Sequence, residues 1–299
     1  MRMRRGYLEV IVCTLTWGSV GIVRNHVTLP SSVIVFFRLG LGAAVVAGWL
    51  ALRGRLSELR PRARPVLLAS SGVLLVVHWV SEFEAFRRLD IAAAILVVFL
   101  GPVLASLAAP AVLGERLSPV TLGALALALG GIALISIPRI SHVDRVGLVY
   151  ALVSAVLFSV LLLAGKVLTE HYEPAPLVVW QLGIGALVVS PALGGASLHE
   201  ISRGFWLMAL LGVAYTGILG IVFFHAMRAL QAQRLGVMFY LEPASAVLYA
   251  WWLLGQTPSP ATFAGGGLIV AAGIAIIVSD RTLSAPAGLP DVIATGEFT

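Results

Sequence analysis

The sequence predicts an all-α membrane protein with ten transmembrane helices, arranged as two inverted repeats of five helices each. Three observations lead to this prediction: an apolar composition, ten apolar segments of membrane-spanning length, and an internal repeat. Hydrophobic residues make up 59% of the chain and charged residues only 11%, whereas about 25% of an average soluble domain is charged. A soluble fold of 299 residues cannot hide so many apolar side chains from water, so we expect lipid to cover them.

The first apolar segment, residues 7–23, follows three arginines and at first sight resembles a secretory signal. It contains Trp17 and Gly18, and no clear small-residue cleavage site follows it. Because nine more apolar segments come after it, we interpret it as a retained first transmembrane helix.

The other nine apolar segments are each close to the length that a helix needs to cross a bilayer core. Helices are expected because lipid offers no hydrogen-bond partners to an open backbone, and short gaps rich in proline separate the segments. The segments are residues 31–52, 65–86, 91–113, 119–138, 146–168, 175–195, 204–227, 235–254 and 261–279. The final stretch, 280–299, is polar, and we expect it to form a disordered cytoplasmic tail.

Basic residues are distributed unevenly over the gaps. If the N-terminus lies in the cytoplasm, thirteen Lys and Arg residues fall on the cytoplasmic side and six on the opposite side. Five of the thirteen lie in the single gap 53–64. This bias predicts a multi-pass protein of the inner (plasma) membrane with both termini in the cytoplasm. Since the net charge of +6 arises from such gaps, no nucleic-acid partner is expected.

A shift of 141 residues aligns the chain with itself. Residues 99–135 and 240–276 are identical at 12 of 37 aligned positions, including the pairs Pro102/Pro243 and Gly114/Gly255. The repeat predicts two units, residues 7–138 and 146–279. Because each unit holds five spans, the second enters the membrane from the opposite side, which is typical of secondary transporters that work by alternating access.

Short motifs are distributed over the two units. They are residues 14–19, 37–38, 114–119 and 130–132 in the first unit, and 147–151 and 255–260 in the second. With the two-copy arrangement of ten spans, these motifs resemble the EamA-type module of the drug/metabolite transporter superfamily, and the chain is most similar to its YddG-type amino-acid exporters. The resemblance implies export or exchange of amino acids, including aromatic ones, other metabolites or cationic drugs. The second unit departs from the first at Gln256, which stands where the first has Glu115.

Ionisable residues inside the apolar segments are costly and are therefore candidates for function. Arg38 could bind a substrate carboxylate; alternatively, it pairs with a buried acid or reaches the interface. Glu242 lies deep in the ninth segment, and its counterpart in the first unit is Gly101. Packing therefore does not require an acid at this place, and we expect Glu242 to bind substrate.

The third segment carries a second pair of candidates. His78 and Glu82 share one helix face at i,i+4 spacing. They could bind a substrate ammonium group or carry a proton; alternatively, Glu82 and Glu84 lie at the interface and meet nearby arginines. Both readings remain open from the residues alone.

Aromatic and proline residues complete the predicted binding site. Trp17, Phe99 and Tyr240 are expected to cover the apolar part of the substrate, and Ser245 shares the helix face of Glu242. Phe158 and Trp180 are further aromatic candidates, although contact with lipid is the commoner role of such residues. Pro102 and Pro243 lack an N–H and are expected to act as hinges in the fourth and ninth segments; alternatively, each is a simple kink of the kind that membrane helices tolerate.

The motifs of ATP-driven pumps and common hydrolases, GxxxxGK[ST], HExxH and GxSxG, do not occur in the sequence. We therefore expect no enzyme activity, catalytic residue, metal or cofactor. The expected partners are a small-molecule substrate and the lipid bilayer, while a coupling proton and the oligomeric state stay open. Two rivals are an intramembrane enzyme, such as a lipid-modifying transferase, and a passive channel with non-saturating flux.

Overall fold

The computed structural model describes residues 2–27, 29–141, 144–195 and 197–284. Every regular element within these ranges is helical. Ten helical segments of this part of the chain are long and apolar enough to cross a membrane, which confirms the fold class and the ten spans predicted from the sequence.

The helices of the first half form spans one to five. The connecting helices η1 and η2 are short 3-10 turns. The elements are α1 (Arg2–Trp17), α2 (Val20–Asn25), α3 (Ser31–Leu52), η1 (Leu56–Leu59), α4 (Pro65–Arg88), α5 (Ile91–Val98), α6 (Leu100–Leu113), α7 (Pro119–Ser136) and η2 (Ile137–Arg139).

The helices of the second half form spans six to ten. Here η3 is a 3-10 turn and η4 is a stretch of π-helix inside span eight. The elements are α8 (Arg145–Leu168), α9 (Pro174–Val189), η3 (Ser190–Gly195), α10 (Leu198–Leu210), η4 (Leu211–Ile218), α11 (Leu219–Ala229), α12 (Ala232–Phe239), α13 (Leu241–Leu254) and α14 (Pro260–Ser284).

The last helix is longer than predicted. The backbone of α14 stays helical to Ser284, so residues 280–284 belong to the helix and not to the expected tail. The rest of that tail, residues 285–299, lies outside the described residues.

Spans four and nine are broken at equivalent places. The break in span four is at Phe99, between α5 and α6, and the break in span nine is at Tyr240, between α12 and α13. Both breaks lie three residues before a proline, Pro102 or Pro243. Proline has no N–H for the carbonyl four residues earlier and crowds it, so each helix changes direction at the same point of the repeat.

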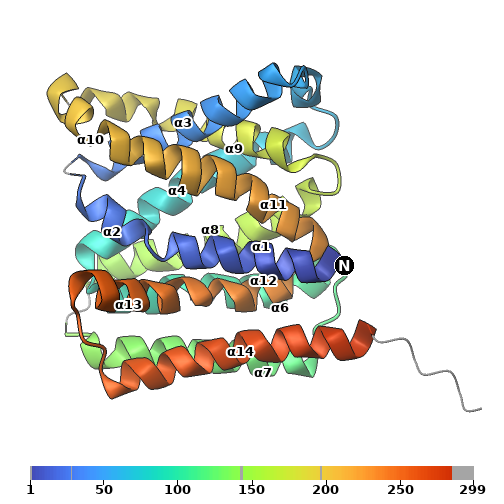
Figure 1. Ribbon diagram of the computed structural model, residues 1–299, viewed down its shortest axis with the longest axis vertical. Helices are drawn as coiled ribbons and strands as arrows, with labels where there is room; N and C mark the ends of the chain where they lie inside the picture. Colours follow the sequence, from blue (N-terminus) through green and yellow to red (C-terminus); the bar gives the residue numbers. More distant parts are fainter. Residues whose placement is uncertain (1, 28, 142–143, 196, 285–299) are drawn as a thin grey trace, which may run out of the picture.

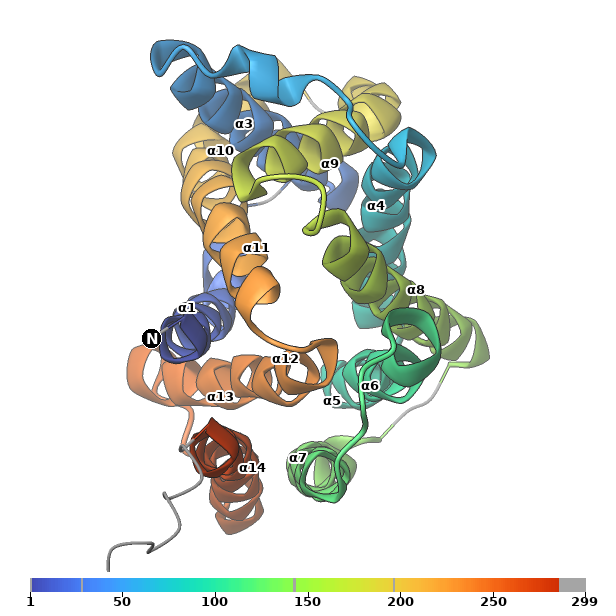
Figure 2. The same ribbon diagram turned by 90° about the vertical axis from the view of Figure 1, so that its right-hand side faces the viewer.

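The contacts between helices follow the repeat. Equivalent spans pack against each other, α3 against α9, α6 against α12 and α7 against α14, and α4 packs on α8 as α1 packs on α11. In Figure 2 most of the helices are arranged in a ring, while α7 and α14 lie side by side at one edge of the bundle. These reciprocal contacts are what two inverted five-helix units produce.

Glycines allow the tightest of these contacts. A Cβ on Gly131 of α7 would lie 2.6 Å from the carbonyl oxygen of Gly265 on α14, and a Cβ on Gly265 would lie 2.5 Å from that of Gly131. Small residues of this kind let membrane helices approach backbone to backbone. Of the three consecutive glycines 265–267, Gly265 makes this contact, whereas a Cβ on Gly266 or Gly267 would meet open space.

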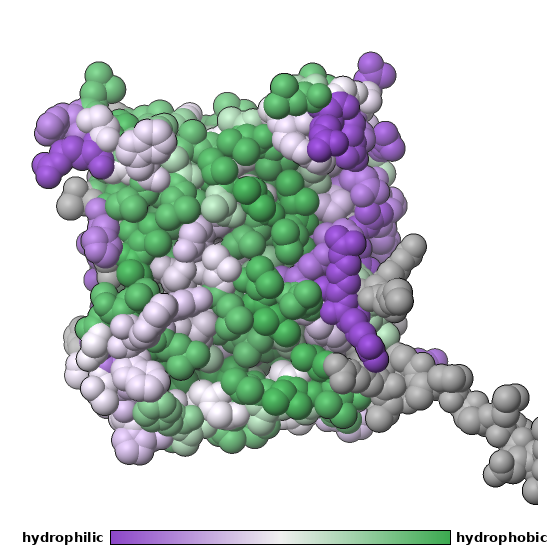
Figure 3. Space-filling view, viewed as in Figure 1, coloured by the Kyte–Doolittle hydropathy of each residue, from purple (hydrophilic) through white to green (hydrophobic). Residues whose placement is uncertain are grey.

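The outer surface matches a bilayer environment. Apolar side chains form a broad band across the face seen in Figure 3, and hydrophilic residues gather at its two edges. Many large apolar residues are exposed, such as Leu187 at 74% and Leu198 at 85%. The N-terminus and the end of α3 lie at the same edge (Figure 1), as two antiparallel spans require.

Candidate substrate cavity

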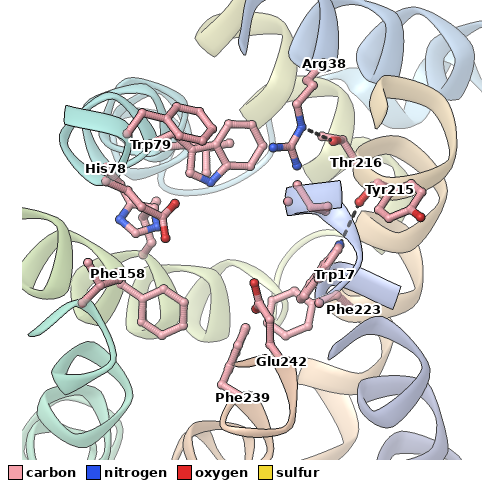
Figure 4. A pocket seen from close by; sticks show the side chains of 18 of the residues that line it. Trp17, Arg38, His78, Trp79, Phe158, Tyr215, Thr216, Phe223, Phe239 and Glu242 are labelled. Carbon is pink, nitrogen blue, oxygen red and sulfur yellow. Dashed lines mark hydrogen bonds between the residues drawn. The ribbon is translucent and has the colours of Figure 1, made fainter. Parts of the chain in front are cut away.

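A cavity of about 670 Å³ lies at the centre of the bundle, which is within the usual range for small-molecule sites. Both repeats contribute to its walls, and most of its surface is apolar or aromatic. The polar side chains that line it are Ser31, Arg38, His78, Glu82, Arg87, Gln181, Tyr215, Thr216 and Glu242. Figure 4 shows labelled members of this set around one open space.

Arg38 of α3 supplies a positive charge deep in the wall. Its side chain is 7% exposed, its Nε donates a hydrogen bond of 3.3 Å to Thr216 Oγ1, and its guanidinium lies 4.3 Å from the centre of the Trp79 ring. It forms no ion pair with any described residue; the carboxylates that act on it electrostatically are those of Glu82 and Glu242. The two alternatives to substrate binding were a salt bridge with a buried acid and a position at the interface. Arg38 forms no salt bridge with a described residue, and its side chain is buried.

The π-helical stretch η4 positions the partner of Arg38. Thr216 Oγ1 donates to the carbonyl of Leu211, five residues earlier, at 2.8 Å, and accepts from Arg38. The carbonyl of Tyr215, also in η4, accepts a 2.9 Å hydrogen bond from Trp17 Nε1. A π-helix widens the backbone turn and frees such groups, which is why π-helices are common at functional sites.

Two carboxylates enter the cavity from other helices. Glu82 lies on α4, and Glu242 lies in the first turn of α13, directly after the break at Tyr240. The carboxylate of Glu242 points into the space from the side opposite to Arg38 (Figure 4). Neither side chain forms a hydrogen bond or ion pair within the described part of the chain, so both are available to a substrate.

Glu82 and Glu84 have different surroundings. Glu84 pairs with Arg87 at 2.7 Å and with Arg88 at 3.5 Å, as the interfacial reading of this segment predicts. Glu82, two residues earlier, points to the cavity instead.

His78 borders the cavity one turn before Glu82. Its Nδ1 lies 3.0 Å from both the carbonyl oxygen and the Oγ of Ser154 on α8, and its ring lies 5.8 Å from that of Phe158. These contacts fix the orientation of the imidazole. His78 and Glu82 therefore share the cavity-facing side of α4, as their spacing predicts.

Four aromatic rings form one cluster beside Glu242. The Phe239 ring lies 4.8 Å from Phe158, 5.4 Å from Phe223 and 6.1 Å from Trp17, measured between ring centres. Trp17 and Phe158 occupy equivalent positions in the two repeats. The cluster thus draws on both halves and offers ring faces to an apolar or cationic group.

Three predicted site residues have other contacts. Tyr240 is fully buried, and its hydroxyl donates a 2.7 Å hydrogen bond to the carbonyl of Phe99, its repeat counterpart. Ser245 Oγ donates to the carbonyl of Glu242 at 2.8 Å and lies 3.4 Å from the carbonyl oxygens of Thr14 and Leu15 on α1. Trp180 Nε1 donates to the carbonyl of Leu59 at 2.8 Å. None of the three lines the cavity, whereas Phe99, Pro102 and Pro243 do.

Several lining residues were not predicted. On α4 the sequence did contain a signal: Leu75, Trp79, Glu82 and Phe86 recur every three or four residues and share one helix face. No comparable signal exists for Thr216, because its place depends on the π-helix.

Toward the end of the bundle that carries the N-terminus, the lining residues Leu162 and Met227 are buried. Three polar contacts lie at that end: Glu9 with His225 at 2.6 Å, Glu173 with Arg228 at 2.6 Å, and Lys166 Nζ with the carbonyls of Met227 and Leu230 at 2.6 Å each. Toward the other end, the lining reaches Arg87 and Ile91, which are exposed. This difference between the two ends of the lining indicates that the cavity opens toward the end opposite to the N-terminus.

Among the described residues, no three His, Cys, Asp or Glu side chains are grouped so that they could hold a metal ion. The arrangement is suited to binding a polar molecule through one guanidinium, two carboxylates and aromatic rings.

Comparison of the sequence with known proteins identifies its family. The sequence model of the EamA-like transporter family matches residues 4–137 and again 145–279. A solved structure titled only as the crystal structure of a protein superposes with a TM-score of 0.81, covering 94% of this chain and 99% of that chain at 22% identity. At this identity the likeness supports the fold alone.

Curated relatives are similar over nearly their whole length. An uncharacterized transporter, YxxF, of Bacillus subtilis is 26% identical over 258 residues, 84% of this chain and 82% of the relative. The pseudopaline exporter CntI of Pseudomonas aeruginosa is 26% identical over 277 residues, 92% of this chain and 96% of the relative. A probable terminal-alkyne amino-acid exporter of Streptantibioticus cattleyicolor is 25% identical over 297 residues, 95% of this chain and 96% of the relative. The chain belongs to the EamA-like transporter family and is a multi-pass membrane transporter, not an enzyme.

Proposed function

We propose that this protein is a secondary transporter that exports or exchanges small zwitterionic metabolites, amino acids first, across the inner membrane by alternating access. The observation that carries the proposal is the pair formed by Arg38 and Glu242, which face one cavity from opposite sides (Figure 4). Two relatives are named exporters, one of them of an amino acid, and this supports the substrate class.

The charges of the cavity complement those of an amino acid. A guanidinium binds a carboxylate through two parallel hydrogen bonds, so Arg38 would hold the α-carboxylate. Glu242 would hold the α-ammonium, since a carboxylate in a site shielded from water binds a cation more strongly than one in water. The cluster of Trp17, Phe158, Phe223 and Phe239 would cover an apolar or aromatic side chain.

The broken spans support alternating access. Spans four and nine bend at Phe99 and Tyr240, and a helix without its full hydrogen-bond ladder at one point can change angle there. The polar contacts toward the N-terminal end are two ion pairs and the two hydrogen bonds of Lys166, which would separate without unpacking the apolar core. With both termini in the cytoplasm, as the charge bias favours, the structure corresponds to an outward-facing state.

Counterflow in proteoliposomes tests the proposal. Vesicles are loaded with one unlabelled amino acid at a time, and uptake of the labelled form is followed. Transient, saturable accumulation above equilibrium is the expected result, and Arg38→Gln or Glu242→Gln should reduce it at least tenfold, because each removes a charge-assisted bond worth about 1.5–3 kcal/mol.

Glu84→Gln is the matched control. It removes a carboxylate from the same helix as Glu82, but one that pairs with Arg87 at the helix end, so counterflow should stay within about twofold of wild type. If folded Arg38→Gln and Glu242→Gln proteins both transport as wild type does, the assignment of the site is wrong. Linear flux without counterflow would instead indicate a passive channel.

Organic cations are the second candidate substrate class. The cavity holds two carboxylates, Glu82 and Glu242, but only one buried guanidinium, and its aromatic rings favour cations. Under this alternative, labelled organic cations show counterflow, amino acids do not, and Arg38→Gln leaves the flux intact while Glu242→Gln abolishes it.

A further inference from the structure

The loop between spans two and three carries an unusual concentration of charge. Residues 53–64, which we term the basic loop, contain five arginines and one acid, Glu58. The equivalent stretch of the second repeat, residues 194–205, contains one arginine and one glutamate. The repeat therefore provides an internal comparison, in which only one of the two equivalent connections is strongly basic.

Most of the charge of the basic loop is not neutralised by the protein. All five arginines are exposed. Arg55 pairs with Glu58 at 2.6 Å, and this hydrogen bond raises the pKa of Arg55. Arg60, Arg62 and Arg64 form no ion pair with the residues that the structure describes, so at least three guanidinium groups are free to bind an external anion.

The backbone of the basic loop is held in one conformation. The hydroxyl of Tyr172, from the connection between α8 and α9, accepts from the N–H of Arg62 at 3.0 Å and of Ala63 at 3.2 Å, and donates to the carbonyl of Ala63 at 2.7 Å. Trp180 of α9 donates to the carbonyl of Leu59 at 2.8 Å. A connection needs charge but no fixed geometry to set membrane orientation, so these contacts point to a further role.

Apolar side chains flank the arginines. Leu52 is 90% exposed, Leu56 is 51% exposed and Val66 is 77% exposed. Arg53 and Arg55 lie 5.8 Å and 5.5 Å from the ring centre of Trp49, a partly exposed residue in the last turn of α3. Hydrophilic residues gather at this corner, beside the apolar band (Figure 3). Cationic groups next to exposed apolar ones match the boundary between lipid headgroups and acyl chains.

We propose that the basic loop is a binding site for anionic phospholipid headgroups, in which Arg60, Arg62 and Arg64 bind phosphate while Leu52, Leu56 and Val66 contact acyl chains. Guanidinium groups bind phosphate oxygens in a bidentate geometry. Because Tyr172 and Trp180 fix the backbone beforehand, less conformational entropy is lost on binding. This inference does not depend on the transported substrate.

Native mass spectrometry of the full-length protein tests the site. The protein is purified in detergent, titrated with phosphatidylglycerol or phosphatidylcholine, and the retained lipid is counted. Wild type should prefer phosphatidylglycerol. Each basic residue near an anionic lipid surface contributes roughly fivefold in binding, so R60Q/R62Q should weaken phosphatidylglycerol binding by about 20- to 30-fold and leave phosphatidylcholine unchanged.

The control is R4Q/R116Q, which removes two other exposed arginines and lowers the net charge by the same amount. It should retain the preference of wild type. Tyr172→Phe keeps all charges but removes the three hydrogen bonds to the loop, and it should weaken phosphatidylglycerol binding several-fold.

Three outcomes would overturn the proposal. One is an equal loss in R60Q/R62Q and R4Q/R116Q, because that is a bulk charge effect. Another is binding unaffected by R60Q/R62Q, which would place the lipid elsewhere. The third is equal binding of both lipids together with selective binding of a polyglutamate peptide to the loop, which would identify an acidic protein as the partner.

Discussion

At the scale of single residues, the surroundings of each charged side chain separate those that face the cavity from those that form ion pairs. Glu82 and Glu84 are two positions apart on α4, yet one faces the cavity and the other pairs with arginines at the helix end. Arg38 keeps its charge inside the bundle through the Trp79 ring and the Thr216 hydroxyl. A buried charge with weak partners is costly, and this cost supports the proposal that a substrate carboxylate neutralises Arg38.

Arg38→Lys tests whether geometry matters as well as charge. Lysine keeps the positive charge but loses the planar face that stacks on Trp79 and the paired hydrogen bonds to a carboxylate. A desolvated cation–π contact is worth up to about 2 kcal/mol, so we expect the KM for counterflow to rise about tenfold. An unchanged KM would show that a simple point charge is enough at this position.

At the scale of helices, α7 and α14 show how small residues determine packing. Gly265→Ala places a methyl group against the carbonyl of Gly131, so the two helices must separate, and such overpacking costs about 1–3 kcal/mol. Gly266→Ala, the neighbouring control, meets open space and gains about 1 kcal/mol of helix propensity. Thermal unfolding in detergent should therefore show a lower Tm for Gly265→Ala and an unchanged or higher Tm for Gly266→Ala. Equal shifts would contradict this account of the contact.

The helices also show which features could be predicted from the sequence: their number and bounds, but not the directions of their side chains. The segments 31–52 and 91–113 coincide with spans two and four, because the length of an apolar segment is set by the bilayer and can be counted. The direction of a side chain depends on which helix lies next to it. Ser245 and Tyr240 therefore face neighbouring helices, although they lie close to Glu242 in sequence, and Trp79 lines the cavity unpredicted. The π-helix η4, which positions Thr216, packs against α3 and accepts a hydrogen bond from Trp17 of α1, and these contacts cannot be read from the local sequence.

At the scale of the whole molecule, the two ends of the cavity differ: its lining is buried at Leu162 and Met227 and exposed at Arg87 and Ile91. Lys166 of α8 donates two hydrogen bonds to the carbonyls at the end of α11, where a cation also interacts favourably with the helix dipole. Charge-assisted bonds of this kind contribute about 1.5–3 kcal/mol each. The proposed alternation between two states requires that these bonds form in one state and break in the other.

Lys166→Met should therefore shift the two states in a reciprocal way. A reporter thiol is placed by Leu162→Cys on the buried lining of the cavity, in a Cys13→Ala background, and is labelled with an impermeant reagent from either side of the membrane. Wild type should react mainly from the side opposite to the N-terminus. With Lys166→Met, reaction from the N-terminal side should rise about tenfold or more, and reaction from the other side should fall.

Glu58→Gln is the control for the same experiment, because it breaks an ion pair within the basic loop that does not bridge α8 and α11. It should leave both labelling rates unchanged. The reciprocity is the decisive feature: a change of population between two states must lower exposure on one side as it raises exposure on the other. If labelling rises from both sides, Lys166 only holds the fold together, and the end of the bundle that carries the N-terminus is not a moving part.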